Sequence, residues 1–226
     1  MSTTSSRRRF LRAAGGSAAA LALASCAKQP EQPKQPDAEK NEVKPVAAAP
    51  SRPAAEVLSR TEFLEYLDKR AQANMEFCHH CAQASFLSLQ QGFGLPESDI
   101  LKALTPLPGI AERGETCGAV VGSLMALGLV FSGSQLGDTA AWQACLVPAR
   151  AFCDRFEKEL GSTQCGDLLE KHFGKRFDLA NPAERAEFIG SNPGPSEICG
   201  KVVRTAVRLA AEIILDNRTP TASCRG

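Results

Sequence analysis

The stretch from Cys117 to Phe131 constrains the fold more than any other part of the chain. It is the most apolar run after residue 57, and it is expected to form a buried helix. Gly118 and Gly122 then share one face, because residues four apart on a helix are neighbours. A glycine inside a helix costs about 1 kcal/mol relative to alanine, so something is expected to approach this face closely. Two interpretations are open: a tightly packed partner helix, or a cofactor or substrate bound against Gly118 and Gly122.

Cys117 stands where this helix is expected to begin. The first turn of a helix carries unpaired N–H groups and a partial positive charge, which favour a thiolate. The thiolate is the form that attacks disulfides and binds metals. Cys165 follows the residues 161–163, Gly-Ser-Thr, and Cys199 follows 195–197, Pro-Ser-Glu, so both have the same placement. We expect the thiolate form to be favoured at all three cysteines.

From Leu58 onward the pattern is helical, with no clear alternation of period two. The expected fold class is all-α, a compact bundle of about five to seven helices after a disordered N-terminal tether. Loops are expected at 105–114 and around Pro182, and Asp138 or Thr139 and Ser196 are expected N-caps. The expected helices are Leu58 to about Ala73, either continuous with Asn74 to Gln91 or broken near Asn74, then Glu97 to Leu104, Cys117 to Phe131, Asp138 to Leu160, Cys165 to Phe173 and Glu197 to Asp216.

The N-terminus carries two export motifs in order. Residues 6–12 fit the twin-arginine pattern, and residues 23–26, Leu-Ala-Ser-Cys, resemble a lipobox. The apolar stretch between them is too short to span a membrane permanently. We expect residues 1–25 to be a signal peptide that is removed, and Cys26 to be lipidated. The protein would then be exported by the twin-arginine route and anchored on the periplasmic side of a bacterial membrane.

Residues 26–57 are rich in Pro, Ala and charge, and are expected to be a lipidated, disordered linker. Residues 58–220 remain for one helical, cysteine-rich domain of about 160 residues. Without residues 1–25 the chain has 22 basic and 25 acidic side chains, a net charge of about −3. It has no basic stripe and few aromatics, so no nucleic-acid partner is expected. Membrane contact is expected through the lipid anchor at Cys26.

The chain has nine cysteines. With Cys26 lipidated the remaining number is even, which fits disulfides in an exported protein. Residues 78–81, Cys-His-His-Cys, have the spacing of redox and metal sites. No c-type haem is expected, because attachment needs His directly after the second cysteine and Ala82 stands there. His79 and His80 either help to bind zinc or are solvated.

Four blocks together resemble a known family. They are residues 81–84, Cys-Ala-Gln-Ala; residues 114–128, which contain Cys-Gly-Ala-Val-Val-Gly; residues 161–165, Gly-Ser-Thr-Gln-Cys; and Cys199. They resemble the redox-active family named for the C-GCAxxG-C-C pattern, over about residues 74–215.

The resemblance implies a small helical protein with a redox role and four characteristic cysteines, which are here Cys81, Cys117, Cys165 and Cys199. A related domain occurs in split-Soret cytochromes, which also carry haem and an iron–sulfur site. Because the haem motif is missing here, only the cysteine part carries over. The cysteines outside the pattern are candidates for structural disulfides: Cys78, Cys145, Cys153 and Cys224.

Three functions are open at this point. The first is thiol–disulfide exchange, in which Cys117 cycles with Cys81 or Cys165. The second is electron transfer through an iron–sulfur cluster bound by Cys81, Cys117, Cys165 and Cys199 as metal ligands. The third is a disulfide-stapled binding lipoprotein without redox turnover. The redox partner is not identified by any motif.

Overall fold

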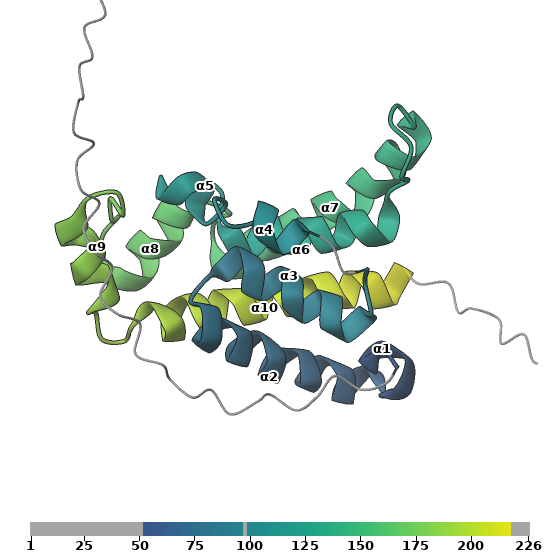
Figure 1. Ribbon diagram of the computed structural model, residues 1–226, viewed down its shortest axis with the longest axis horizontal. Coiled ribbons are helices and arrows are strands. Elements are labelled where there is room, and N and C mark those ends of the chain that lie inside the picture. The colour runs from purple at the N-terminus through teal and green to yellow at the C-terminus, as the bar shows by residue number, and fades with distance from the viewer. Residues whose placement is uncertain (1–51, 97–98, 218–226) are drawn as a thin grey trace, which may run out of the picture. The chain divides into compact units, whose positions relative to one another are not determined.

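The computed structural model describes residues 52–96 and 99–217, and this part of the chain is all-α without strands. Seven helices have eight or more residues and three have four (Figure 1). The expected fold class is confirmed. The predicted signal peptide, Cys26, most of the predicted linker and Cys224 lie outside the described residues. The helices are α1 Ala54–Val57, α2 Arg60–Cys78, α3 Cys81–Phe93, α4 Ile100–Ala103, α5 Gly109–Glu112, α6 Gly118–Phe131, α7 Thr139–Leu160, α8 Cys165–Phe173, α9 Pro182–Ile189 and α10 Pro195–Asn217.

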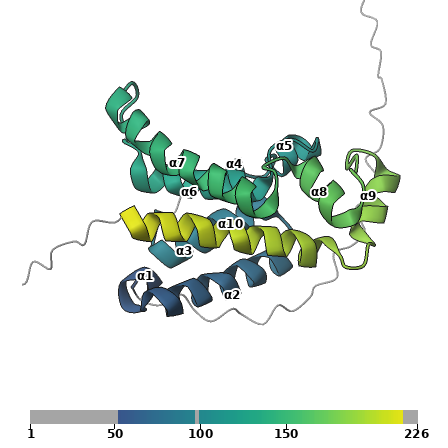
Figure 2. The ribbon, with the colours of Figure 1, turned by 180° about the vertical axis from the view of Figure 1, so that it is seen from behind.

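The last helix, α10, forms the centre of the bundle. It packs against α2, α3, α6 and α7, and lies between α2 and α7 in Figures 1 and 2. Its buried face is apolar and follows helical spacing, with Val203, Ala206, Val207, Ala210 and Ile214 all inaccessible to solvent. Opposite it lie the largest fully buried side chains, among them Phe63, Phe86, Leu127 and Phe152. Each stabilises the fold by about 1.5–3 kcal/mol.

Helices α3 and α6 approach each other at the two glycines of the opening segment. A Cβ on Gly122 would lie 2.2 Å from the carbonyl oxygen of Ala82, and a Cβ on Gly118 would lie 2.5 Å from the Cys81 sulfur. Only glycine fits at either position. The face of α6 that carries them is therefore covered by a partner helix, and a role of these glycines in binding a cofactor stays a prediction.

The break between α2 and α3 lies at His79, so neither alternative from the sequence, a continuous helix or a break near Asn74, is right. Asn74 is inside α2, where its side-chain amide donates a 2.9 Å hydrogen bond to the Ser88 hydroxyl of α3. This pair satisfies two buried polar groups across the helix contact, so Asn74 does not end the helix. His79 does so in the left-handed conformation, with φ 49°.

Two expectations near the C-terminus are wrong. Residues 182–189 form α9 and not a loop: the Asn181 side chain caps this helix and Pro182 occupies its first position. Ser196 does not cap the last helix, because α10 already begins at Pro195. The Ser196 hydroxyl instead lies 2.6 Å from Nδ1 of His79.

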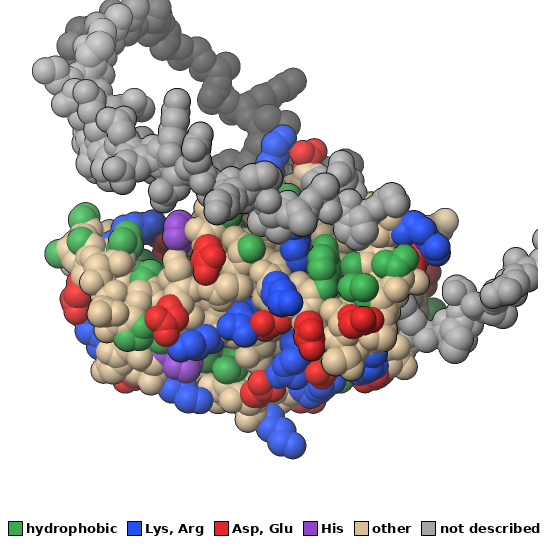
Figure 3. Space-filling view, turned by 90° about the horizontal axis from the view of Figure 1, so that it is seen from below, with side chains coloured by type: hydrophobic (Ala, Val, Ile, Leu, Met, Phe, Trp, Pro, Cys, Tyr) green, Lys and Arg blue, Asp and Glu red, His purple; other side chains and the backbone are tan. Residues whose placement is uncertain are grey.

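The surface over α2 and α10 is charged. Arg204 of α10 forms a two-pronged ion pair with Asp68 of α2, at 2.6 and 2.7 Å, and Arg60 pairs with Asp216 at 2.8 Å. Figure 3 shows acidic and basic side chains intermixed on the molecule seen from below. Among the described residues, no helix is both long enough and apolar enough to cross a membrane.

Candidate functional site

The four cysteines of the family pattern all stand at or near the start of a helix. Cys117 is the N-cap of α6, Cys165 is the first residue of α8, and Cys199 lies in the second turn of α10, counted from Pro195. These three placements agree with the sequence within one turn. Cys81 joins them as the first residue of α3. This was missed from the sequence, because residues 74–91 showed no break at the histidines.

The His79–His80 junction makes Cys81 a helix start. His80 is the N-cap of α3: its Nδ1 accepts a hydrogen bond from the Gln83 N–H, and its Nε2 lies 3.0 Å from the Thr105 carbonyl, to which it donates. Both ring nitrogens are therefore occupied by this chain. Within residues 52–96 and 99–217, no group of three or more His, Cys, Asp or Glu side chains is placed to hold a metal ion.

A short antiparallel bridge between Thr116 and Gln164 joins the starts of α6 and α8. The Cys117 N–H donates to the Thr163 carbonyl at 2.8 Å, and the Cys165 N–H donates to the Glu115 carbonyl at 2.6 Å. These backbone bonds hold Cys117 and Cys165 beside each other although they are far apart in sequence. No local pattern indicates such a bridge, because it pairs single residues from two loops.

Cys81 and Cys117 interact directly. Their side chains lie within hydrogen-bonding reach of each other. Gly118 makes room for this contact, since any side chain there would overlap the Cys81 sulfur. Cys117 is buried, with 6% of its surface exposed, whereas Cys81 is half-buried.

The interaction separates the acidities of the two thiols. The hydrogen bond from Cys81 lowers the pKa of Cys117, burial opposes this, and the backbone N–H groups of Ala119 and Val120 lower that pKa further. The same hydrogen bond, together with burial and the charge of Cys117, raises the pKa of Cys81 well above its usual value. The pKa values of the two thiols are therefore shifted in opposite directions, and Cys117 loses its proton more readily than Cys81.

The other two thiols stay protonated. Burial, then the charges of Cys117 and Glu112, raise the pKa of Cys165 to about 12. Burial, then the charges of Cys117 and Cys165, raise the pKa of Cys199. The expectation that every helix-start thiolate is favoured is thus wrong for Cys165 and Cys199, because loss of water outweighs the helix N-terminus. These shifts also show that the four sulfurs lie close enough to influence one another.

All seven cysteines of the described residues are free thiols in this structure. The Cys78 thiol donates to the His80 carbonyl at 3.7 Å, and burial raises its pKa. Cys145 and Cys153 lie on α7, half-buried. A structural disulfide among Cys78, Cys145, Cys153 and Cys224 stays a prediction.

The loop before Cys117 is strained. Ile110, Ala111 and Glu112 have consecutive φ angles of 49°, 57° and 63°, in the region that side chains rarely adopt. Such residues cost about 1–3 kcal/mol each and are found mostly at functional sites. Gly109 stands directly before them, and a Cβ there would lie 3.3 Å from the Cys165 sulfur. The strained turn therefore packs on the cysteine site.

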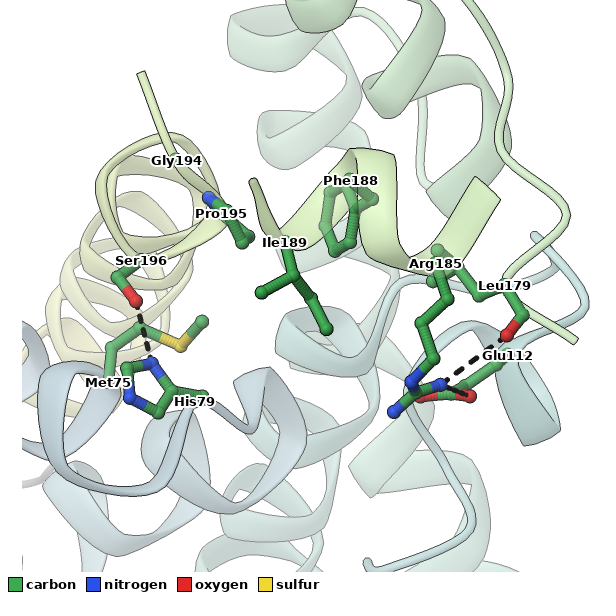
Figure 4. A pocket seen from close by; sticks show the side chains of 10 residues that line it. All are labelled: Met75, His79, Glu112, Leu179, Arg185, Phe188, Ile189, Gly194, Pro195 and Ser196. Carbon is green, nitrogen blue, oxygen red and sulfur yellow. Dashed lines mark hydrogen bonds and ion pairs between the residues drawn. The ribbon is translucent and has the colours of Figure 1, made fainter. Parts of the chain in front are cut away.

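A pocket of about 410 Å³ opens between the end of α2, the strained turn, α9 and the start of α10 (Figure 4), and none of the four cysteines is among the residues that line it. At one side His79 pairs with Ser196, three residues before Cys199. At the other, Arg185 of α9 forms an ion pair with Glu112 of the strained turn. Met75, Leu179, Phe188 and Ile189 supply apolar surface. The size and the mixed lining are those of a small ligand site.

The comparison with protein families identifies the family of the chain. A family model described as "Putative redox-active protein (C_GCAxxG_C_C)" matches residues 79–213, which is more than half of the chain. The chain belongs to this family. The matched range contains Cys81, Cys117, Cys165 and Cys199, and their assignment to the four cysteines of the pattern stays a prediction. No curated protein and no solved structure matches the chain.

Proposed function

We propose that this C_GCAxxG_C_C protein is a membrane-tethered thiol–disulfide redox protein in which Cys81 and Cys117 alternate between dithiol and disulfide. The observation that carries the proposal is the close approach of the Cys81 and Cys117 side chains beside Gly118, with their pKa values shifted in opposite directions. A pair of thiols of unlike acidity is what stepwise exchange needs, because one sulfur has to leave while the other stays bonded.

The structure suggests which sulfur meets the partner. In the disulfide form, a thiolate of a dithiol partner attacks the half-buried Cys81 sulfur. The Cys81–Cys117 bond breaks, and Cys117 leaves as a thiolate that the N–H groups of Ala119 and Val120 stabilise. The partner's second thiol then loses its proton and attacks the partner sulfur, which releases Cys81. Cys81 takes up one proton and the solvent the other, so the partner is oxidised by two electrons.

The same interactions favour a reaction in which the Cys81–Cys117 disulfide oxidises its partner. Because the buried Cys117 thiolate is stabilised only in the reduced form, reduction of the disulfide is made more favourable. The partner class that fits is therefore a dithiol, on a protein or a small molecule. Cys165 and Cys199 stay protonated beside the pair, so they add no negative charge next to the Cys117 thiolate.

An iron–sulfur centre is the competing function. Cysteine thiolates are the ligands of such clusters, and four cysteine side chains lie close enough here to shift one another's pKa. In the described residues, however, no three of these side chains are placed to hold one metal ion, so we give the dithiol chemistry precedence.

The decisive experiment maps the disulfide. Full-length chain carrying Cys26→Ser is purified without oxygen, reduced, and treated with one equivalent of a small disulfide; free thiols are alkylated and peptides identified by mass spectrometry. We expect a Cys81–Cys117 link that Cys145→Ser leaves intact and Cys117→Ser abolishes. Stoichiometric iron with absorption near about 400 nm in protein from its native host would overturn the dithiol proposal in favour of a cluster. If all cysteines were held in disulfides that resist mild reductant, the result would favour a binding lipoprotein without redox turnover.

The tether is proposed from residues 6–12 and 23–26. Growth with labelled fatty acid should label the protein, and Cys26→Ser should remove the label. Replacing Arg7 and Arg8 by Lys should stop export through the twin-arginine route. Labelling that survives Cys26→Ser would overturn the anchor.

A further inference from the structure

The tip of the α6–α7 hairpin exposes apolar side chains that nothing in the fold covers. Of the eight large hydrophobic side chains exposed among the described residues, five lie between positions 125 and 147. Their exposed fractions are 41% for Met125, 39% for Leu129, 106% for Leu136, 57% for Trp142 and 69% for Val147. In Figure 1 this part of α7 projects from the bundle. Apolar side chains gathered in this way mark an interaction surface.

The tip is also almost without charge. Between Cys117 and Ala149 the only ionisable Asp, Glu, Lys or Arg is Asp138. Its carboxylate accepts a 2.9 Å hydrogen bond from the Ala141 N–H and so caps α7. The face over α2 and α10, by contrast, is covered with ion pairs. A protein partner selected by charge finds nothing to pair with on the tip, whereas a lipid surface needs no such pairing.

The position of the tip relative to the tether also favours a lipid surface as its partner. In Figures 1 and 2 the tip lies at the same end of the long axis as α1, where the described chain begins, and α8 and α9 lie at the other end. A flexible chain of the length of residues 26–51 has an end-to-end distance of about 30 Å. A lipid on Cys26 would therefore hold the α1 end close to the bilayer, with the tip beside it.

We propose that the α6–α7 tip inserts into the membrane–water interface, with Leu136 of the loop deepest and Trp142 and Val147 of α7 at the level of the lipid headgroups. This deepens the proposed function and rests on its membrane tether. Tryptophan is typical of that layer, because its ring is apolar and its N–H can reach water. The tip has no Lys or Arg, so binding depends on apolar burial and not on anionic lipid. The pocket of Figure 4, at the opposite end, then faces away from the membrane.

Trp142 is the chain's single tryptophan, which makes it a direct reporter. Full-length chain carrying Cys26→Ser is titrated with phosphatidylcholine vesicles, with and without brominated acyl chains. We expect Trp142 emission to shift to shorter wavelength and to be quenched by the brominated lipid, equally at low and high salt. The added pair Leu136→Glu and Val147→Glu should reduce the quenching at least about fivefold, since each places a charge at the bilayer.

Phe77→Glu is the matched control, because Phe77 is 66% exposed but lies on α2; it should leave the quenching unchanged. All variants contain residues 1–25, so vesicle binding through that segment is the same in each of them. It cannot account for a difference in Trp142 quenching between variants. If Trp142 emission does not change when vesicles are added, the proposal is overturned. A blue shift without vesicles that grows with protein concentration also overturns it, because it would show a second copy covering the tip. The proposed anchor and disulfide are judged separately, by fatty-acid labelling and by peptide mapping.

Discussion

Both ends of α6 are apolar, but only the second end carries exposed side chains among its buried ones. At its start, Gly118, Ala119 and Val120 are buried under α3 beside the cysteines. Near its end, Met125 and Leu129 are exposed. The contrast is sharpest at two glycines: a Cβ on Gly122 would meet the Ala82 oxygen at 2.2 Å, and one on Gly128 would meet nothing within 4 Å. Apolar sequence alone therefore does not tell whether a segment is core or surface. The neighbouring helix decides it.

The largest effect is expected at the cysteine end. Cys117→Ser should slow oxidation of a model dithiol by about 100-fold or more, because serine is neither a thiolate nor a leaving group in disulfide exchange. The rate is measured by following the dithiol under anaerobic conditions. Cys145→Ser, near the hairpin tip, is the control and should keep the wild-type rate. Equal rates for the two variants would show that the cysteine end is not the reactive one.

The glycine pair tests the packing difference within one helix. Gly122→Ala should lower the free energy of unfolding by about 2–3 kcal/mol, since its methyl group overlaps backbone of α3. Gly128→Ala should raise it by about 0.5–1 kcal/mol, because alanine is the better helix former and the space is open. Urea unfolding of the reduced proteins measures both. If both substitutions changed the free energy of unfolding in the same direction, the contrast between the two ends of α6 would be contradicted.

The buried thiols predict a pH dependence that the tip lacks. The pKa of Cys165 is raised from 9.0 to about 12 in the folded protein, so between these values the unfolded chain loses a proton that the folded protein keeps. The free energy of unfolding should therefore fall as pH rises through this window, by up to about 1.4 kcal/mol per pH unit for this group. Urea unfolding of the reduced protein at pH 8 and pH 10 measures it. Cys165→Ser should make the dependence shallower, and an unchanged slope would count against the buried thiol.

The smallest effect is expected at the tip. Leu136→Ser removes a fully exposed side chain, so the free energy of unfolding should change by no more than about 0.5 kcal/mol. The same urea titration measures this. A loss of 2 kcal/mol or more, about the value of a buried leucine, would show that Leu136 is covered in solution.

Helices with strong local signals were predictable from the sequence, and contacts between distant segments were not. The bounds of α8 agree fully with the prediction, and α6 and α7 agree within one residue at their starts, because apolar runs, Asp138 and the glycines that follow the helices are local signals. The break at His79 was missed, since a non-glycine residue with positive φ has no sequence signature. Helix α9 was taken for a loop because Asn181-Pro182 also fits a turn.

The same division holds at the site. The four cysteines were identified by their pattern, and three of them by their place at helix starts. Their unequal acidity was not predictable, because it depends on burial and on which sulfur donates to which. The pocket beside α9 was missed for the same reason: its lining comes from four separate segments.

The bridge between Thr116 and Gln164 has a consequence for variation around the site. Its hydrogen bonds run only through main-chain atoms, so the side chains at 115, 116, 163 and 164 can be exchanged while the two sulfurs keep their places. Proline at 115 is an exception, since it removes the N–H that donates to the Gly109 carbonyl. Redesign of partner preference can therefore begin on these loops, with the spacing of the cysteines left as an invariant of the scaffold.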